Sequence, residues 1–459
     1  MRYIPHTEAE RQAMMAAIGI QDIDELFAAV PADYRYPQLD LPEPMTEMEV
    51  MRELEMMAAD NANLREFASF LGAGAYNHFV PAVVDTIISR GEFYTAYTPY
   101  QPEISQGTLQ AAFEYQSMVA ALTGMEVVNA SHYDGATAVA EAAVMAVNIQ
   151  RHKRRTILIS PTLHPQYRQV LRTYTQGMDL KIVGDELESH DFHAISDMCN
   201  NDTALVVVQN PDFLGKLHTP QEMQDLADAV HAKGALLAVA TDPIALGLLT
   251  PPGDYGADIV TADGQVLGNG LNFGGPYLGI FAFRAKHMRK SSGRLVGETV
   301  DVDGNKGYVL TLSTREQHIR REKATSNICS NQALNALVAA VYLAAMGKHG
   351  LRKAAELSWH KAHYAAQKID QLPAYGVAND TPFFKEFVVT CPRPVSEINQ
   401  YLLEEYGIIG GYDLSQDYPE LGNAMLLCVT EMNTREEIDD LVTALQEAAN
   451  PQIRLEVTQ

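Results

Sequence analysis

Six short apolar segments, separated by stretches of helical periodicity, most strongly constrain what this chain can fold into. They cover residues 156–159, 180–183, 205–208, 236–240, 259–261 and 278–283. Helices are expected between them at 166–175 and 221–232, and ahead of them at 104–122 and 136–151. Strands that are apolar along their whole length are buried on both faces, as in sheets whose parallel strands are joined by helices. The pattern predicts a large α/β domain with a mostly parallel sheet and right-handed crossovers.

Sequence on either side of this pattern indicates two further parts, because 459 residues exceed what one hydrophobic core usually organises. Residues 1–80 are rich in Met, Ala and Glu, and helices expected at 7–18, 23–29 and 46–70 make them an N-terminal helical arm. The large α/β domain then covers 81–330. A helix at 331–346 leads into a small α+β C-terminal domain, 331–459, with elements expected at 353–369, 384–391, 395–406, 424–429 and 435–448.

Composition excludes several classes of function. A formal net charge of -24 disfavours nucleic acid and anionic membrane surfaces as partners, since both require positive patches. The four cysteines are far apart and lack CxxC spacing, so neither a metal site nor a disulfide framework is predicted. The N-terminus has no apolar signal-peptide core, and no run of about 18 apolar residues indicates a membrane span. We expect a cytoplasmic protein whose partners are small molecules and other proteins.

A glycine-rich stretch at 256–279 follows an apolar strand that ends in Asp242. Many pyridoxal-phosphate (PLP) enzymes hold the pyridinium nitrogen with a carboxylate in this position, and bind the cofactor aldehyde as an imine with a lysine ahead of a glycine-rich turn. From Pro243 to Ala285 the chain contains no lysine, and the matching position is Gln265. An amide nitrogen is not nucleophilic and cannot form the imine. The sequence therefore predicts a PLP-enzyme fold without its lysine.

Other residues are candidates for vestiges of a cofactor site. Asp134 opens an expected helix whose first residues, Gly135, Ala136 and Thr137, would offer free amides to a phosphate. The alternative is a capped helix with no ligand. His132 has the chemistry to stack on a pyridine ring, or is a solvated loop histidine, and Asp242 is either a relic of pyridinium binding or the cap of the Pro243 turn.

Two polar segments are candidates for substrate binding or for an interface. The first is a proline-punctuated loop dense in hydroxyl and amide groups: Tyr94, Tyr97, Thr98, Tyr100, Gln101, Glu103, Ser105 and Gln106. The second gathers Arg315, Arg320, Arg321 and Lys323 in an otherwise acidic chain. Arg320 and Lys323 are candidates to bind the carboxylate or phosphate of a ligand, or they neutralise acidic neighbours.

Four motifs carry a resemblance to a known family. They are FLGAGAYNHFVP at 70–81, YTAYTPYQPEISQG at 94–107, FGGPY at 273–277 and REQHIRREKATSNIC at 315–329. Their order and extent resemble the P-protein of the glycine cleavage system, in its split form, as the alpha subunit.

This resemblance implies fold-type I architecture and a heterotetrameric enzyme that decarboxylates glycine with PLP and passes the aminomethyl group to the lipoyl arm of the H-protein. It also implies that the PLP lysine belongs to the beta subunit, that Gln265 stands in the lysine position here, and that the tyrosine-rich loop lies near the active-site cleft between the subunits.

Two alternatives remain open at the level of the sequence. The chain could be an independent PLP-dependent decarboxylase or lyase that uses a displaced lysine such as Lys286 or Lys323. It could also be a catalytically silent scaffolding or regulatory subunit that only stabilises its partner.

Overall fold

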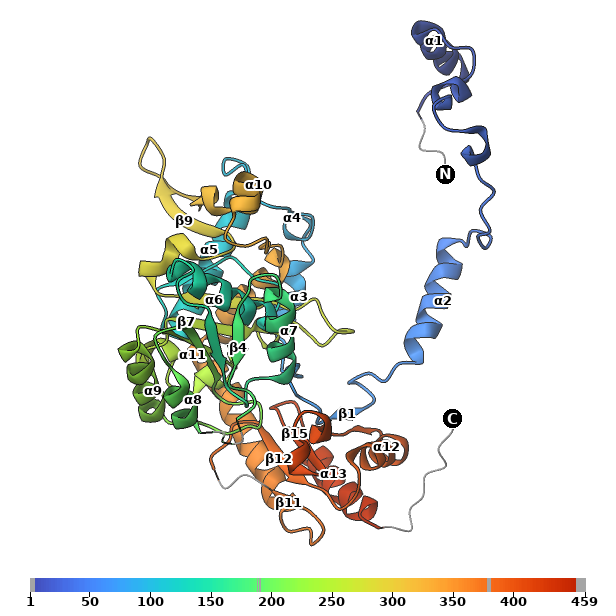
Figure 1. Cartoon of the computed structure of the whole chain (residues 1–459). Helices are drawn as coiled ribbons and strands as arrows, with labels where there is room; N and C mark the ends of the chain where they lie inside the picture. The colour runs from blue at the N-terminus through green and yellow to red at the C-terminus, as the bar shows by residue number, and fades with distance from the viewer. Residues whose placement is uncertain (1–4, 188, 190, 378–380, 451–459) are drawn as a thin grey trace. The chain divides into compact units, whose positions relative to one another are not determined.

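The computed structural model describes residues 5–187, 189, 191–377 and 381–450, and the chain divides into two units, Met1–Ala62 and Asn63–Gln459 (Figure 1). The first unit contains two helices, α1 (Glu8–Ile18) and α2 (Glu47–Ala59), and two short 3-10 helices, η1 (Ile23–Phe27) and η2 (Ala32–Tyr34). Each α-helix begins with a capping box, from Thr7 and Glu10 in α1 and from Thr46 and Glu49 in α2.

The predicted helix at 46–70 is wrong beyond Ala59. The side chain of Asn63 accepts the N–H of Arg65, a local bond that competes with helix continuation. Further along, Ala68–Ser69 forms strand β1, which pairs in parallel with β13 (Ile408–Ile409). The extended backbone of 68–69 is therefore fixed by a partner far away in the sequence.

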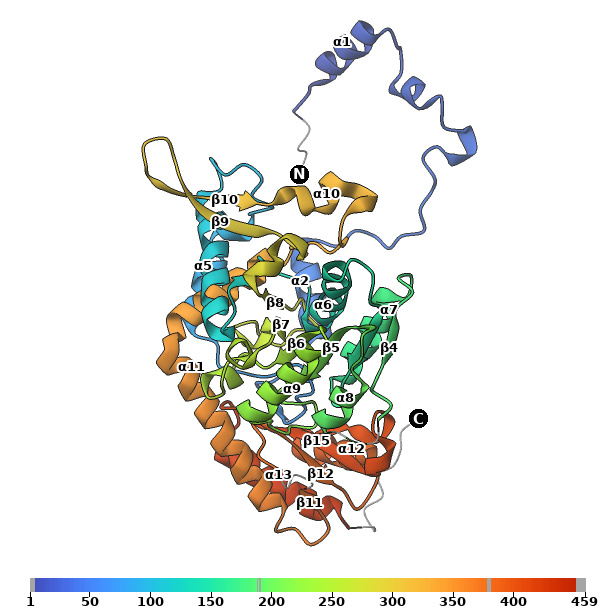
Figure 2. The same ribbon diagram turned by 60° about the vertical axis from the view of Figure 1, so that its left-hand side comes forward.

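A seven-stranded sheet organises the second unit (Figure 2). Its strand order is β2-β8-β7-β6-β5-β3-β4, and the five strands from β7 to β4 are parallel, which confirms the predicted mostly parallel sheet. The strands are β2 (Val127–Val128), β3 (Thr156–Ile159), β4 (Lys181–Val183), β5 (Thr203–Gln209), β6 (Leu236–Thr241), β7 (Ile259–Asp263) and β8 (Gly279–Phe283). Strand β8, the last of these along the chain, lies between β2 and β7 and runs antiparallel to both.

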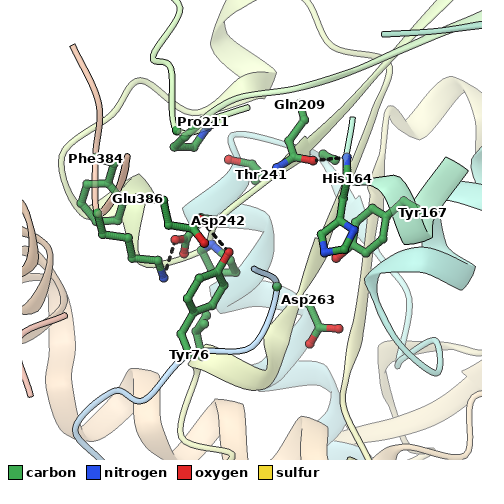
Figure 3. A pocket seen from close by; sticks show the side chains of 16 residues that line it. Tyr76, His164, Tyr167, Gln209, Pro211, Thr241, Asp242, Asp263, Phe384 and Glu386 are labelled. Atoms are coloured by element: carbon green, nitrogen blue, oxygen red, sulfur yellow. Dashed lines mark hydrogen bonds and ion pairs between the residues drawn. The ribbon is translucent and has the colours of Figure 1, made fainter. Parts of the chain in front are cut away.

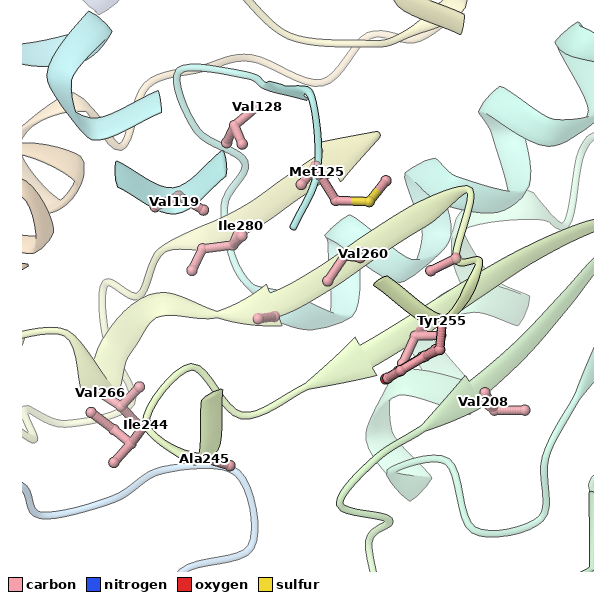
Figure 4. Close-up of a cluster of buried hydrophobic side chains, with 14 of the residues drawn as sticks. Val119, Met125, Val128, Val208, Ile244, Ala245, Tyr255, Val260, Val266 and Ile280 are labelled. Carbon is pink, nitrogen blue, oxygen red and sulfur yellow. The ribbon is translucent and has the colours of Figure 1, made fainter. Parts of the chain in front are cut away.

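Helices cover both faces of this sheet, which explains why its strands are apolar along their length. On one face, side chains such as Val208, Val260 and Ile280 pack with α5 (Gln106–Thr123), α8 (Phe192–Met198) and α9 (Pro220–Ala232) (Figure 4). On the other face, alternate residues such as Val207 and Phe281 pack with α6 (Gly135–Ile149) and α7 (Pro165–Thr175).

A smaller sheet lies toward the C-terminus, with the order β11-β12-β15-β14 and every pairing antiparallel. Its strands are β11 (Gly376–Val377), β12 (Glu386–Thr390), β14 (Tyr412–Asp413) and β15 (Ala424–Cys428). Helices α12 (Val395–Tyr406) and α13 (Arg435–Ala448) pack on it through Leu402, Leu441 and their neighbours. These elements have the predicted α+β order.

Helix α11 (Ala333–Ile369) connects the two sheets and consists of two helical stretches joined at a kink, in agreement with the two helices expected from the sequence. Its backbone breaks at Gly347, which has a φ of 56°, a conformation that glycine adopts without steric cost. Among the described residues, one helix, α11, has the length and the apolar composition needed to cross a bilayer. Its buried residues, such as Ala339 and Ala365, pack in the two cores.

The remaining elements surround the large sheet. They include α3 (Ala82–Ile88), α4 (Gly91–Tyr94), α10 (Gln317–Arg320) and the antiparallel hairpin of β9 (Leu295–Val300) and β10 (Lys306–Thr311). Gln106, at the start of α5, holds this hairpin: its amide donates to the carbonyl of Tyr308 and accepts the N–H of the same residue.

Candidate functional site

A pocket lies at the carboxyl ends of the parallel strands, where open α/β sheets bind ligands (Figure 3). His164 follows β3, Gln209 ends β5, Asp242 follows β6 and Asp263 ends β7. The small sheet closes the pocket with residues that adjoin and begin β12. We call this the filled pocket, because its own side chains form hydrogen bonds and an ion pair with one another.

The carboxylate of Asp242 is paired with a lysine that sequence reasoning missed. Lys385 Nζ lies 2.7 Å from Asp242 Oδ2 and 3.4 Å from the centre of the Tyr76 ring, and the lysine is 1% exposed. The other oxygen of Asp242 accepts the N–H of Ile244 at 2.9 Å, so the predicted turn cap is also present. The ammonium of Lys385 thus occupies the place beside Asp242 that a pyridinium would need.

His78 and Glu431 continue this buried network. Lys385 Nζ lies 2.9 Å from His78 Nε2, and His78 Nδ1 lies 2.7 Å from Glu431 Oε2. Since the ammonium can only donate, Nε2 accepts and Nδ1 donates to the carboxylate. Burial lowers the pKa of His78, and for Glu431 the bond from His78 overcomes burial and lowers the pKa to about 2.

Gln265 is buried and its carboxamide forms three hydrogen bonds with backbone. Its oxygen accepts the N–H of Tyr76 at 2.9 Å, and its nitrogen donates to the carbonyls of Tyr76 at 3.0 Å and Asn269 at 2.6 Å. A lysine has no acceptor and could not reproduce the bond from the Tyr76 N–H. Gln265 therefore binds the 70–81 motif to the end of the large sheet.

The same motif closes the filled pocket from the side of the small sheet. The carboxyl of Glu386 accepts the N–H of Ala73 at 2.8 Å and the hydroxyl of Tyr76 at 2.9 Å, and burial raises its pKa to about 7. The ring of His164 lies 2.9 Å from the carbonyl of Ala73 and stacks on Tyr167. In Figure 3, Tyr76, Asp242 and Glu386 point toward one another.

The N-terminus of α6 was predicted as a vestigial phosphate cradle. Asp134 caps it, since its carboxylate accepts the N–H of Thr137 at 2.7 Å. The N–H of Gly135 donates to Asp263 Oδ2 at 3.1 Å, and a Cβ on Gly135 would lie 2.3 Å from the hydroxyl of Tyr167. Burial raises the pKa of Asp263 to about 7. A carboxyl group and a phenol therefore occupy the space in front of the helix amides.

His132 is fully buried, so its interpretation as a solvated loop histidine is wrong. Its backbone pairs with Gly279, which draws the residue into the sheet, and its ring contacts that of Phe281. Burial lowers its pKa to about 3, so the imidazole is neutral. Its Nε2 lies 3.1 Å from the hydroxyl of Ser292, and the residue does not line the filled pocket.

These residues do not fit PLP. Lys385 pairs with the carboxylate that would hold a pyridinium, Asp263 and Tyr167 lie in front of the α6 amide that would hold a phosphate, and Gln265 replaces the imine-forming amine. The lysines considered from the sequence do not line the filled pocket: Lys286 pairs with Asp258 at 3.1 Å with its side chain mostly exposed, and Lys323 is exposed on η8 (Arg321–Lys323).

The two polar segments of the sequence meet in a second place, which we call the polar cleft. Tyr97, Thr98 and Tyr100 form one side of it, and the other sides come from 291–294, 315–318 and 325–330. Arg294 joins them: it donates to the hydroxyl of Tyr100 at 3.1 Å and lies 3.3 Å from Glu316 Oε2. Arg315 also lines the cleft, and it donates to the carbonyl of Gly293 at 3.0 Å.

An apolar slot adjoins the polar cleft and shares Tyr97, Thr98, Arg294 and Ser330 with it. Tyr94 also lines the slot, and the apolar part of its lining includes Phe93, Ala111, Ala112, Val296, Leu310, Leu334 and Leu337. Tyr94 and Tyr97 are 69% and 87% exposed, so both hydroxyls are available to another molecule.

Not every predicted residue lies in these sites. Gln101 and Glu103 are exposed and line neither the polar cleft nor the apolar slot. Ser105 precedes α5, and Gln106 forms its hydrogen bonds with the β9–β10 hairpin. Arg320 and Lys323 are exposed and lie outside the lining of the polar cleft, whereas Arg315 is part of it. His164 and Asp263 could have been found from the sequence because each follows an apolar strand, but Lys385 carried no such signal.

Comparison with known proteins decides the family. The family described as "Glycine cleavage system P-protein" matches residues 1–445. The chain belongs to the glycine cleavage system P-protein family. It is similar to proteins described as "Probable glycine dehydrogenase (decarboxylating) subunit 1". The one from Thermomicrobium roseum is 54% identical, covering 98% of this chain and 100% of the relative. The one from Moorella thermoacetica is 52% identical, covering 97% and 99%.

One solved structure agrees with this membership in the P-protein family, and a more distant one shares its fold. A crystal structure of glycine decarboxylase (P-protein) of the glycine cleavage system, in inhibitor-bound form, has a TM-score of 0.89 and 43% identity, and covers 98% of this chain and 100% of that chain. A sphingosine-1-phosphate lyase from Burkholderia pseudomallei, with a TM-score of 0.64 and 15% identity over 91% and 94% of the two chains, shares the fold alone. The predicted fold-type I architecture of PLP-dependent enzymes is confirmed.

Proposed function

We propose that this chain is the alpha subunit of a two-subunit glycine dehydrogenase (decarboxylating), and that PLP binds at the lysine of a beta subunit. The assembled enzyme decarboxylates glycine and transfers the aminomethyl group to the lipoyl arm of the H-protein. One observation carries the proposal: the residue in the lysine position, Gln265, has its carboxamide committed to the backbone of Tyr76 and Asn269.

The rest of the filled pocket supports the same assignment. Asp242 is neutralised by Lys385, so a cofactor pyridinium would have to displace a buried ammonium. The phosphate would have to displace the carboxyl of Asp263 from the Gly135 N–H. The first displacement would leave the buried ammonium of Lys385 without its counter-ion, which costs several kcal/mol, and the second would leave the carboxyl of Asp263 without the Gly135 N–H. The contribution of this chain to catalysis therefore lies outside its own pocket.

The polar cleft and the apolar slot are the surfaces that this chain offers to the assembly. Exposed hydroxyls of Tyr94 and Tyr97 stand beside an apolar lining, an arrangement suited to contacts with a partner subunit and with a substrate that has polar and apolar parts. We place the wall of the beta subunit's active site here. Glycine and the lipoyl arm would meet this wall in a cytoplasmic heterotetramer.

Co-expression tests the proposal. This chain is produced with a lysine-bearing beta chain of the P-protein family, and glycine-dependent exchange of labelled CO2 is measured with H-protein. Activity is expected for the pair and not for this chain alone. Exchange by this chain alone, at the rate of the pair, would contradict the proposal.

Lysine labelling distinguishes the proposed subunit from the alternative of an independent PLP-dependent enzyme. PLP is added to the isolated chain, the sample is reduced with borohydride, and peptides are mapped. We expect no pyridoxyl-lysine in the filled pocket, because the ammonium of Lys385 is held by Asp242 and His78. Stoichiometric labelling of Lys385, Lys286 or Lys323 with glycine decarboxylation would favour an independent enzyme instead. A silent scaffold would be indicated if substitutions in the polar cleft left the assembled enzyme fully active.

A further inference from the structure

Among the described residues, a buried carboxylate behind the polar cleft has no counter-ion. Glu141 lies in the middle of α6, is 0% exposed and is surrounded by the apolar side chains that pack against the sheet. In the part of the chain that the structure describes, no lysine, arginine or histidine forms an ion pair with it. An isolated carboxylate in such surroundings costs several kcal/mol unless hydrogen bonds offset the loss of water.

Hydroxyl groups take the place of a counter-ion. Glu141 Oε1 accepts from the hydroxyl of Tyr174 at 2.7 Å and from that of Ser326. Burial raises the pKa of Glu141, and the hydroxyls of Ser292, Ser326 and Tyr174 act in the opposite direction. Ser292 and Ser326 both line the polar cleft, and they belong to different walls of it.

Each of these serines fixes the backbone of its wall. The hydroxyl of Ser326 accepts the N–H of Ile328 at 3.1 Å, which holds the turn at 326–328. The hydroxyl of Ser292 lies 3.1 Å from the imidazole of His132, and its carbonyl accepts from Asn129 at 3.3 Å. Glu141 contacts Ser326 directly, so its position relates the 325–330 wall to helix α6.

We propose that Glu141 is a positioning residue for the reaction of the assembled enzyme. From behind the polar cleft it holds the wall of Ser326 against α6, in the position that the partner's active site requires. The inference rests on the proposed function, because it assumes that the polar cleft is part of that active site. Glu141 is 0% exposed, so it touches no substrate itself.

The test uses the complex of this chain with the beta subunit. Glu141→Ala is expected to lower kcat/KM for glycine-dependent CO2 exchange about tenfold, since small displacements of positioning groups carry costs of this size. Affinity for the beta subunit should stay close to that of the wild type, and exchange is measured well below the melting temperature of the variant, which the cavity left by the side chain lowers. Ser326→Ala should show a similar loss. The double variant should lose no more than either single variant, because both remove the same link.

Two further variants make the result specific. Glu141→Gln keeps the oxygen that accepts from Ser326 and should recover most of the activity. Thr175→Val is a matched control: it removes one buried hydroxyl, which bonds to the carbonyl of Leu171 within α7, and should leave exchange unchanged. If Glu141→Ala does not fold, Ser326→Ala alone carries the test, since it deletes one loop hydroxyl.

Several outcomes would overturn the inference. These are wild-type exchange by Glu141→Ala, a loss of exchange that only follows a loss of assembly, additive effects in the double variant, or a Gln variant as impaired as the Ala variant. Tyr97→Phe is measured in the same assay to separate the positioning role of Glu141 from the proposed function of the polar cleft. If it lowers activity while Glu141→Ala does not, the positioning role alone is rejected; if both retain full activity, the proposed function of the cleft is rejected as well.

Discussion

The carboxamide of Gln265 and the backbone of Tyr76 exchange two hydrogen bonds, with N···O distances of 2.9 and 3.0 Å. This pairing turns the position of a catalytic lysine into a structural joint between the large sheet and the 70–81 motif. The neighbouring pair of Lys385 and Asp242 joins the small sheet to the same place. The filled pocket is thus a set of contacts that holds the second unit together.

Restoring the lysine should not restore an active site. Gln265→Lys is expected to leave glycine-dependent CO2 release by the isolated chain at background. The reason is that Lys385 still forms the ion pair with Asp242, and Asp263 still accepts the N–H of Gly135. The variant also loses the acceptor for the Tyr76 N–H. Radiometric CO2 release by the purified variant checks this. A rate near that of the assembled enzyme would show that the site lacked only its nucleophile.

Removing Lys385 should destabilise the chain far more than removing an exposed lysine. Lys385→Met leaves the largely buried carboxylate of Asp242 without its counter-ion, and breaking a buried pair in this way costs about 3–5 kcal/mol. The double variant Lys385→Met/Asp242→Asn removes both charges and should recover much of the loss. Urea unfolding of the isolated chain measures both, with the exposed Lys353→Met as control. A double variant as unstable as the single one would contradict the role of the charge pair.

Glu386 should make stability depend on pH. Burial raises its pKa in the folded state to about 7, above its usual value of 4.5, so the folded chain binds the proton more tightly than the unfolded chain. Its contribution is fully present below about pH 4.5 and is lost as the pH rises to about 7. Asp263, whose pKa is also raised to about 7, acts in the same direction.

Glu386→Gln tests this dependence, since a neutral amide can accept from Ala73 and donate to the hydroxyl of Tyr76. We expect the stability of the variant, relative to the wild type, to increase between pH 5 and pH 7.5, by up to about 3 kcal/mol. Urea midpoints across this range provide the measurement. The exposed Glu405→Gln should follow the wild type. A constant difference between variant and wild type at all pH values would argue against titration of Glu386.

Hydroxyl groups of the tyrosine-rich loop should matter for activity more than for assembly. Tyr97→Phe keeps the ring and removes the hydroxyl of a residue that lines the polar cleft and is 87% exposed. We expect about a tenfold loss of CO2 exchange in the complex, comparable to the loss of one hydrogen bond to a transition state. Gel filtration and exchange assays measure assembly and activity. Equal losses of both would mean that the loop is structural.

The sequence by itself determined the large sheet and the loss of the lysine. Apolar segments alternating with helical periodicity leave few arrangements besides a parallel sheet covered on both faces, because burial must match the repeat of each element along the chain. The absence of lysine from Pro243 to Ala285 is visible without coordinates. The four motifs at 70–81, 94–107, 273–277 and 315–329 likewise indicated the family, which the comparisons confirmed.

Only the tertiary structure decided which side chains occupy the site that lacks the lysine. Lys385 reaches Asp242 because the small sheet packs against the ends of the large one, and no local pattern encodes that approach. His132 has the sequence surroundings of a loop residue, yet pairing with Gly279 buries it. The extended segment at 68–69, predicted as helix, depends on its pairing with Ile408–Ile409. Periodicity records which side of an element is buried, whereas the partner of each buried charge depends on how distant elements pack.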